Sequence, residues 1–513
     1  MKLARTRNTV RNTSWGIVYR LITLIGPFVV RTLIVNELGL EYSGLSSLFT
    51  SILTVLNLTN LGFSSSIVFN MYKAIADDDI EAQCAMINYY KRVYKIVGVV
   101  ILIFGIITMP FLPHFVEGDV PSDINLYSLF AIYLFETVLD YFLFAYTTAI
   151  FNAYQRNDVL LKISCVRYLA QYLLQAIAII VTHNYYIYII ILPLMVIPNN
   201  IANYYYSRKY YPEIKSEGTI SESTRKDILL RVGTLFGHKV GSTALVGIDS
   251  ILISSFLGLA TMGLYGNYYY ILTAVNALIE IVTNGLISGI GNKLLLDDKE
   301  SNFGLFNALT YGWVFLVGWA ANSLYNLYQP FIAGIWYSKD YLLPSSIVVV
   351  IVIYFYTWMF RIMQLTYRDA AGLWTKDWLK PYVGMVLNVV FSIVLLIKMR
   401  NVAAALIPTI FVFIFIYTPW ESWTLFKYLF DGSIHRYHFD LLKYTLLNVL
   451  AVLLSNYLCY LISPDLTAIS FLLRFIILTI IQYSLWCLLT FKTKEFHYLL
   501  NYINRFRRKR TEK

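Results

Sequence analysis

Fourteen apolar segments follow one another along this chain, and short polar loops separate them. A helix needs about 20 mostly apolar residues to cross the hydrocarbon core of a bilayer. Only 14% of the residues are charged, well below the fraction typical of soluble proteins. We therefore predict an all-α polytopic membrane protein. The predicted spans are 12–36, 43–70, 93–113, 124–150, 160–182, 184–206, 229–256, 262–290, 303–328, 342–366, 377–398, 402–426, 440–462 and 467–491.

The basic residues indicate an even number of spans with both termini in the cytoplasm. When the loops are assigned alternately to the two sides, most of the 41 lysines and arginines fall on the cytoplasmic side, as the positive-inside rule requires. The net charge of +11 therefore follows from membrane orientation and does not indicate nucleic-acid binding. The exceptions are Lys339, Lys398 and Arg400 outside, and Arg20, Arg31, Arg167, Lys239 and Arg474 within spans.

Two stretches of the chain are copies of each other, 219 residues apart. The pattern LGLxxxGL at residues 38–45 recurs at residues 257–264, and nine of the 20 positions from 38 to 57 are identical at this offset. Six predicted spans separate the copies, so both halves keep the same orientation and form parallel repeats. We predict two six-helix lobes around a central cavity, followed by two C-terminal helices. The predicted boundaries are 1–206 for the N-terminal lobe, 207–228 for a cytoplasmic linker, 229–428 for the C-terminal lobe and 429–513 for the last two helices and a basic tail.

The same offset aligns two cations inside apolar spans, Arg20 and Lys239. A charge at the bilayer centre costs about 2.5–3.5 kcal/mol on insertion scales, so it usually faces a cavity or a partner. Arg31 lies three helical turns beyond Arg20, on the same helix face. We predict that these three cations line the cavity and bind an anion such as a phosphate. The alternatives are pairing with internal carboxylates and, for Arg31, extension toward the membrane surface.

Polar side chains recur beside the aligned cations. Thr54 and Asn57 align with Thr273 and Asn276, and Glu280 lies one turn beyond Asn276. We predict that these five side chains line a hydrated cavity, although small polar residues also serve helix packing in membranes.

Three further carboxylates lie within predicted spans. Glu136 and Asp140 are one helical turn apart and share a face, and Asp249 lies in the seventh span. Such groups could hold a coupling H⁺ or Na⁺, or could neutralise an arginine, and the sequence leaves both roles open.

Several motifs of catalysis and cofactor binding are missing from the sequence. It contains no GxxxxGK[ST] loop, no HExxH or GxSxG pattern and no cluster of His and Cys at metal-ligand spacing. We therefore expect no catalytic residue, no metal and no cofactor, and we expect a transporter and not an enzyme. Transport would then draw on an ion gradient, the membrane potential or the substrate gradient.

A set of short motifs extends over residues 12–113. Its members are Asn12-Thr13, Arg31, Leu38-Gly39, Gly44-Leu45, Leu48-Phe49, Leu61-Gly62, Tyr72-Lys73 and Pro110-Phe111-Leu112-Pro113. These motifs resemble those of Wzx-type polysaccharide flippases, which belong to the multidrug/oligosaccharidyl-lipid/polysaccharide exporter superfamily. The rest of the chain resembles this family in helix count.

This resemblance implies a function. Such proteins flip undecaprenyl-pyrophosphate-linked oligosaccharides from the cytoplasmic to the outer leaflet of the bacterial cell membrane by alternating access. It implies Arg20, Arg31 and Lys239 as cationic cavity residues, although many relatives carry arginine where this chain has Lys239. The implied partners are the lipid-linked oligosaccharide, membrane lipids, a coupling H⁺ or Na⁺, and the glycosyltransferases and polymerase of the same pathway.

Two other functions remain open at this point. An ion-coupled multidrug exporter of the same superfamily would favour an acidic cavity, whereas the aligned positions here are basic. A membrane glycan polymerase would need a large outer loop for catalysis, and the predicted outer loops of this chain are short.

Overall fold

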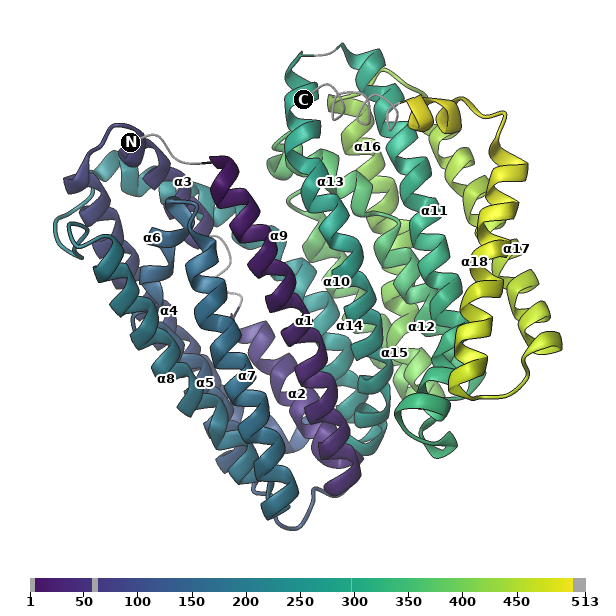
Figure 1. The fold of residues 1–513 in the computed structure, drawn as a ribbon, viewed down its shortest axis with the longest axis horizontal. Coiled ribbons are helices and arrows are strands. Elements are labelled where there is room, and N and C mark those ends of the chain that lie inside the picture. Colours follow the sequence, from purple (N-terminus) through teal and green to yellow (C-terminus); the bar gives the residue numbers. More distant parts are fainter. Residues whose placement is uncertain (1–4, 58–62, 297, 502–513) are drawn as a thin grey trace. The chain divides into compact units, whose positions relative to one another are not determined.

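The structure is a computed structural model of the chain and describes residues 5–57, 63–296 and 298–501. Within these ranges it does not describe the side chains of residues 5–10, 63–66, 231, 234–246, 282, 284, 285, 288 and 295. The regular elements of the described residues are helices, without a strand, which confirms the all-α prediction (Figure 1).

In its described residues, the first part of the chain forms ten α-helices and two 3₁₀ turns. Their bounds are α1 Arg5–Glu37, α2 Leu40–Leu56, α3 Phe63–Ala76, α4 Ile80–Thr108, η2 Met109–Phe115, α5 Leu126–Phe142, η3 Ala145–Thr147, α6 Thr148–Ala153, α7 Asn157–Thr182, α8 Tyr185–Tyr210, α9 Glu222–Leu257 and α10 Leu259–Leu296.

The second half continues with helices that are interrupted by π and 3₁₀ segments. Their bounds are α11 Lys299–Phe331, η4 Ile332–Trp336, η5 Lys339–Tyr341, α12 Ser345–Met359, α13 Ile362–Ala370, η6 Leu373–Lys376, α14 Lys380–Met399, α15 Val402–Phe411, η7 Val412–Tyr417, α16 Thr418–Tyr428, α17 Ile434–Ile462 and α18 Ala468–Thr490.

Ten helices of the described residues are long and apolar enough to span a membrane, or eleven if the bent pair α5 and α6 forms one span. The bend of 50° follows Phe144, whose φ of 53° interrupts the helix. Predicted span 43–70 coincides with α2 and α3 together, span 229–256 with α9 and span 262–290 with α10. These helices are not among the ten or eleven that meet the criterion of length and hydropathy over the described residues. The total of fourteen spans therefore stays a prediction.

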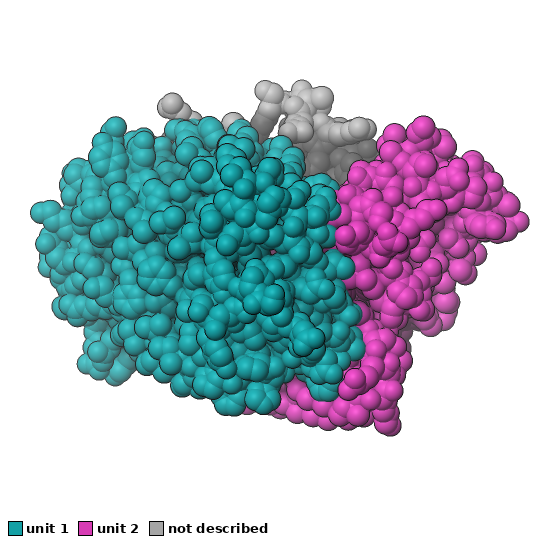
Figure 2. All heavy atoms as spheres, turned by 90° about the horizontal axis from the view of Figure 1, so that it is seen from below, with its two compact units in different colours: residues 1–263 teal, residues 264–513 magenta. Residues whose placement is uncertain are grey.

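The chain forms two compact units, residues 1–263 and 264–513, which Figure 2 colours separately. The division falls inside α10, so unit 1 includes α9 and the first turn of α10. The lobe boundaries predicted from the repeat, 1–206 and 229–428, describe a different division and stay a prediction.

Helix starts in unit 1 follow the expected capping chemistry. Asp79 caps α4 by accepting a hydrogen bond from the backbone N–H of Ala82, Asn125 caps α5 and Ser221 caps α9. Such side-chain oxygens satisfy backbone donors that have no partner within the helix.

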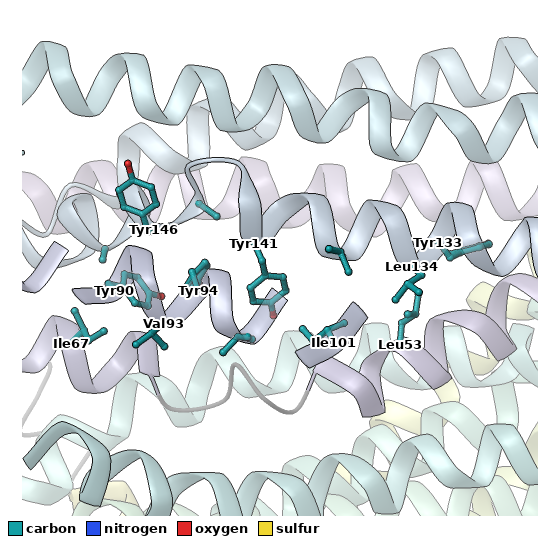
Figure 3. Packing of buried hydrophobic residues seen from close by; sticks show 14 of the residues in the cluster. Leu53, Ile67, Tyr90, Val93, Tyr94, Ile101, Tyr133, Leu134, Tyr141 and Tyr146 are labelled. Atoms are coloured by element: carbon teal, nitrogen blue, oxygen red, sulfur yellow. The ribbon is translucent and has the colours of Figure 1, made fainter. Parts of the chain in front are cut away.

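Aromatic side chains between α2, α4 and α5 form much of the core of unit 1 (Figure 3). The ring of Phe49 meets those of Phe130 and Tyr133 edge-on, with centroids 5.4 and 5.6 Å apart. Tyr94 lies against Tyr141 at 5.3 Å. These contacts hold α2, which carries the first copy of the duplicated pattern, against the other helices of its unit.

The two C-terminal helices are joined to α11 by buried polar side chains. Asn448 on α17 accepts hydrogen bonds at Oδ1 from Gln482 Nε2 and Trp486 Nε1 on α18, at 2.9 and 3.0 Å. Its own Nδ2 donates to the backbone oxygen of Val314 on α11 at 3.1 Å. Asn322 of α11 donates to Ser455 and to Gln482. Hydrogen bonds of this kind hold helices together where lipid supplies no hydrophobic driving force between them.

Candidate substrate-binding site

The duplicated pattern places glycines at two matching helix turns. Gly39, before α2, has a φ of 121°, and Gly258, between α9 and α10, has a φ of 85°. Both values lie in the region that glycine adopts without steric cost. The turn at Gly258 also lies close to another segment, because a Cβ there would be 2.9 Å from the backbone oxygen of Glu117.

The second glycines of the two copies bring the copies into direct contact. A Cβ on Gly44 would lie 2.1 Å from the backbone oxygen of Leu259, and a Cβ on Gly263 would lie 2.2 Å from the backbone oxygen of Leu40. Leu40 and Gly44 align with Leu259 and Gly263 at the 219-residue offset, so the contact is reciprocal. All four residues belong to unit 1. Small residues permit this close approach of helix backbones in membrane proteins.

Arg31 lies beside this contact. From α1 it donates to Ser47 Oγ on α2 at 3.3 Å and to the backbone oxygen of Gly263 at the start of α10 at 3.1 Å. Ser47 in turn donates to the backbone oxygen of Ser43. The guanidinium therefore links the two copies of the duplicated pattern to α1.

Arg20 is half-buried on α1. Among the described residues, no carboxylate lies within 4.0 Å of its guanidinium. Lys239 lies within helix α9, but its side chain is outside the described part of the structure. Convergence of these two cations on one cavity stays a prediction.

The polar residues of the first copy lie near the C-terminal end of α2. Thr54 is exposed and donates to the backbone oxygen of Thr50 at 2.7 Å. Asn57 follows the last residue of α2 and accepts a hydrogen bond from the Tyr141 hydroxyl at 2.9 Å. Asn57 thus has a contact within unit 1, and the cavity-lining role of Thr54 and Asn57 stays a prediction.

The polar residues of the second copy lie on α10 within unit 2. Thr273 donates to the backbone oxygen of Tyr270 at 2.9 Å. Asn276 donates to Glu280 Oε1 at 3.2 Å, while its own Oδ1 is buried without a hydrogen-bond partner. Their predicted role as cavity lining stays a prediction.

The carboxylates of α5 have partners on two neighbouring helices. Glu136 lies 3.7 Å from Arg167 of α7, and Asp140 accepts a hydrogen bond from Asn200 of α8 at 2.7 Å. These contacts favour a structural role for both carboxylates, and ion coupling stays a prediction. Asp249 on α9 is buried, with 1% of its surface exposed.

A buried cluster of charges in unit 2 was missed by the sequence analysis. Arg361 donates to Glu421 through Nε at 3.1 Å, and Lys380 bridges Glu421 and Asp377 at 2.8 and 2.7 Å. Arg368 contacts Asp377 and Asp369 at 3.2 and 2.8 Å. Arg361 and Lys380 lie near predicted span ends, where hydropathy treats them as membrane-surface cations.

Two carboxylates in the sequence could have indicated this cluster. One is Glu421, which stands alone in the apolar span 402–426, and the other is Asp377. Asp377 aligns at the 219-residue offset with a second buried carboxylate, Asp158. A search for acidic residues shared by the two copies would have found this pair.

No group of three or more His, Cys, Asp or Glu residues that could hold a metal ion is found in the part of the chain that the structure describes. The described side chains around the duplicated segments supply cations, hydroxyls, amides and the carboxylate of Glu280. Such groups bind anions and hydroxyl-bearing ligands.

Comparison with known protein families shows to which family the chain belongs. The sequence model of the family described as "Polysaccharide biosynthesis protein" matches residues 9–287, more than half of the chain. The chain belongs to this polysaccharide biosynthesis protein family. The matched stretch contains both copies of the duplicated pattern and the three cations Arg20, Arg31 and Lys239.

Solved structures share the fold of this polysaccharide biosynthesis protein. The lipid II flippase MurJ in an inward closed conformation superposes with a TM-score of 0.64 at 16% identity, over 94% of this chain and 98% of that one. An inward-facing multidrug resistance MATE family transporter of the MOP superfamily has a TM-score of 0.59 at 13% identity, over 80% and 97%. A MOP superfamily transporter from Pyrococcus furiosus Vc1 (DSM3638) has a TM-score of 0.56 at 11% identity, over 82% and 95%.

A search of curated proteins finds none that matches this sequence. The apolar helices and the shared fold identify a multi-pass membrane protein with the MOP-superfamily fold, a fold of flippases and transporters.

Proposed function

We propose that this polysaccharide biosynthesis protein flips undecaprenyl-pyrophosphate-linked oligosaccharides from the cytoplasmic to the outer leaflet of a bacterial cell membrane, for surface or exported polysaccharide. The main support is family membership over residues 9–287, the stretch that contains Arg20, Arg31 and Lys239. Alternating access of the two predicted lobes would carry the pyrophosphate across. Both termini would lie in the cytoplasm.

The fold comparison favours a flippase over a drug exporter. The lipid II flippase covers 94% of this chain, whereas the multidrug transporter covers 80%. A substrate with a prenyl chain, a pyrophosphate and sugars needs lipid contact, cations and polar groups together. The chain has apolar helix surfaces, cations within its predicted spans and polar side chains on the duplicated segments.

The predicted cations would divide the work along α1. Arg20 is the candidate for first contact with the pyrophosphate, because it has no carboxylate partner among the described residues and lies in the half of α1 that is predicted to face the cytoplasm. Lys239 would add a second charge, as a point charge without the bidentate fork of arginine. Arg31 would act beyond them, at the contact between the duplicated segments.

The test is flipping by the double variant Arg20→Ala with Lys239→Ala. Each lost charged hydrogen bond is worth about 1.5–3 kcal/mol, so transport of a lipid-linked oligosaccharide into proteoliposomes should fall more than tenfold. The same variant should not restore surface polysaccharide in cells that lack the gene. The matched control is Lys339→Ala with Lys398→Ala, which removes the same charge from exposed positions predicted to lie outside.

Two outcomes would contradict the proposal. Normal flipping by the Arg20 and Lys239 variant at normal protein levels would show that these cations do not bind the pyrophosphate. Efflux of organic cations without any glycolipid transport would instead identify a multidrug exporter.

A further inference from the structure

A groove of about 680 Å³ lies between α7 and α8 of unit 1, next to the start of α1, and it is separate from the duplicated segments. It extends along α7 from Arg156 to Ala170 and along α8 from Tyr210 to Met195, a length of about 20 Å at the rise of an α-helix. One end is lined by cations and tyrosines. The other is lined mainly by the apolar side chains of Val166, Ala170, Met195 and Pro198, together with Arg167, which lies 3.7 Å from Glu136.

The charged end of the groove surrounds one buried carboxylate. Asp158 has a fully buried side chain and is contacted by Arg11 at 3.1 Å, by Arg156 at 2.9 Å and, more distantly, by Lys162 at 3.9 Å. Asn12 fixes this arrangement, because it accepts from the backbone N–H of Asp158 and donates to the backbone oxygen of Gln155.

Three cations thus surround one carboxylate, and a surplus of two positive charges remains. The cations are accessible, with 36%, 22% and 42% of the side chains of Arg11, Arg156 and Lys162 exposed. The guanidinium of Arg156 lies over the ring of Tyr210, 5.4 Å from its centroid. Its hydrogen bond to Asp158 raises the pKa of Arg156 above the ordinary value, so it stays charged.

The second copy of the repeat supplies an internal comparison. Asp377 aligns with Asp158 at the 219-residue offset, and it too has a fully buried side chain with two cations around it. There the three cations of the cluster, Arg361, Arg368 and Lys380, are matched by three carboxylates, Glu421, Asp377 and Asp369.

The cations of the second cluster are also shielded. Their side chains are 5%, 13% and 3% exposed. The matching position is therefore neutral and closed in one copy of the repeat and basic and open in the other. The cluster around Asp377 thus shows that carboxylates of the protein can balance the cations at this position. The cluster around Asp158 has one carboxylate for three cations.

We propose that the groove between α7 and α8 binds an anionic glycerophospholipid of the cytoplasmic leaflet, with its phosphate on Arg156, Lys162 and Arg11 and an acyl chain along the apolar end. The start of α7 and the end of α8 are both on the predicted cytoplasmic side, where anionic headgroups attract basic residues. The apolar end extends toward the membrane core, as an acyl chain requires. The site does not depend on the flippase function.

The test compares phospholipid binding by the full-length protein and two variants. Arg156→Gln with Lys162→Gln leaves Arg11 to balance Asp158, which makes the cluster neutral like its counterpart. Each cation near a membrane surface is worth about 1 kcal/mol, so the dissociation constant for phosphatidylglycerol, measured by native mass spectrometry, should rise about thirtyfold, or about 2 kcal/mol. Ala202→Phe should reduce binding of the same lipid by filling the groove without changing its charge.

The matched control is Lys226→Gln with Lys299→Gln, which removes two exposed cations from the same predicted side of the membrane. It should bind phosphatidylglycerol as the wild type does. Equal binding by the neutralised variant and the wild type would overturn the proposal. Equal affinity of the wild type for phosphatidylcholine would also overturn it, as would equal stabilisation by glycerol phosphate, because either result removes the need for an anionic lipid.

Discussion

At the scale of single residues, the chain handles its intramembrane charges in two ways. Arg361 and Lys380 are neutralised by Glu421 and Asp377 in a cluster that is almost closed to solvent. Arg20 has no carboxylate within 4.0 Å of its guanidinium among the described residues, and its role as a ligand-binding cation stays a prediction. A buried ion pair adds little net stability, but loss of one partner leaves a charge without compensation.

Glu421→Gln should therefore destabilise unit 2. The substitution leaves Arg361 and Lys380 facing a neutral amide, which should cost about 3–5 kcal/mol and lower the melting temperature in detergent. Lys380→Met added to this variant should recover part of the loss, because it removes one of the unbalanced cations. Glu222→Gln is the control, since Glu222 is 69% exposed and its ion pairs lie at the surface. A melting temperature for Glu421→Gln equal to that of the control would contradict the role of the cluster.

At the scale of helices, the attachment of α17 and α18 depends on a few buried amides. These two helices lie outside the duplication, and Asn448 connects both to α11. Gly318 on α11 makes room for it, because a Cβ there would lie 2.0 Å from Asn448 Oδ1. The helix pair is thus fixed to unit 2 by hydrogen bonds as well as by apolar packing.

Asn448→Leu should loosen this helix pair. It removes the acceptor of Gln482 Nε2 and Trp486 Nε1, and a buried donor without a partner costs about 1–3 kcal/mol. Hydrogen exchange of backbone amides in α18 should become faster, and the melting temperature should fall. Asn456→Leu, at an exposed position of the same helix, should change neither. Unchanged exchange in Asn448→Leu would show that apolar contacts alone hold the pair.

At the scale of the whole molecule, the sequence predicts an even number of spans, whereas hydropathy identifies ten or eleven in the described part. The difference concerns α2 with α3, α9 and α10, which carry the polar residues of the duplicated segments. Among the described residues, Leu40–Leu56, Ile67–Ala76 and Gly247–Leu257 are apolar helices that are shorter than the criterion requires.

The orientation of the loops tests the predicted topology. In a background without native cysteines, Asp119→Cys should react with a membrane-impermeant maleimide in intact cells, because residue 119 is exposed and lies in an acidic loop predicted to be outside. Glu222→Cys, at the exposed start of α9, should react only after the cells are permeabilised. The opposite labelling pattern would reverse the predicted topology. The prediction places an odd number of spans between residues 119 and 222, so labelling of both positions in intact cells would contradict it.

Hydropathy and the internal repeat predict the helices well, because both depend on residues close in the chain. Span 160–182, for example, coincides with α7 except for its first turn. The charge partners were harder to predict, because Arg361 meets Glu421 across 60 residues and the meeting depends on how three helices pack. Arg31 was predicted as a cavity cation, and its contact with the backbone of Gly263 could not be deduced from spacing, since a backbone acceptor has no sequence signature.

The reciprocal glycine contact restricts how the two halves of this protein can evolve. Each glycine faces the backbone of the other copy, at 2.1 and 2.2 Å from a would-be Cβ, so a larger residue in either copy shifts both. A gene duplication normally allows its two copies to diverge, but here the glycine of each copy must fit against the backbone of the other copy. This mutual constraint explains why both aligned positions, Gly44 and Gly263, are glycine, and we expect viable changes at these two positions to arise in pairs.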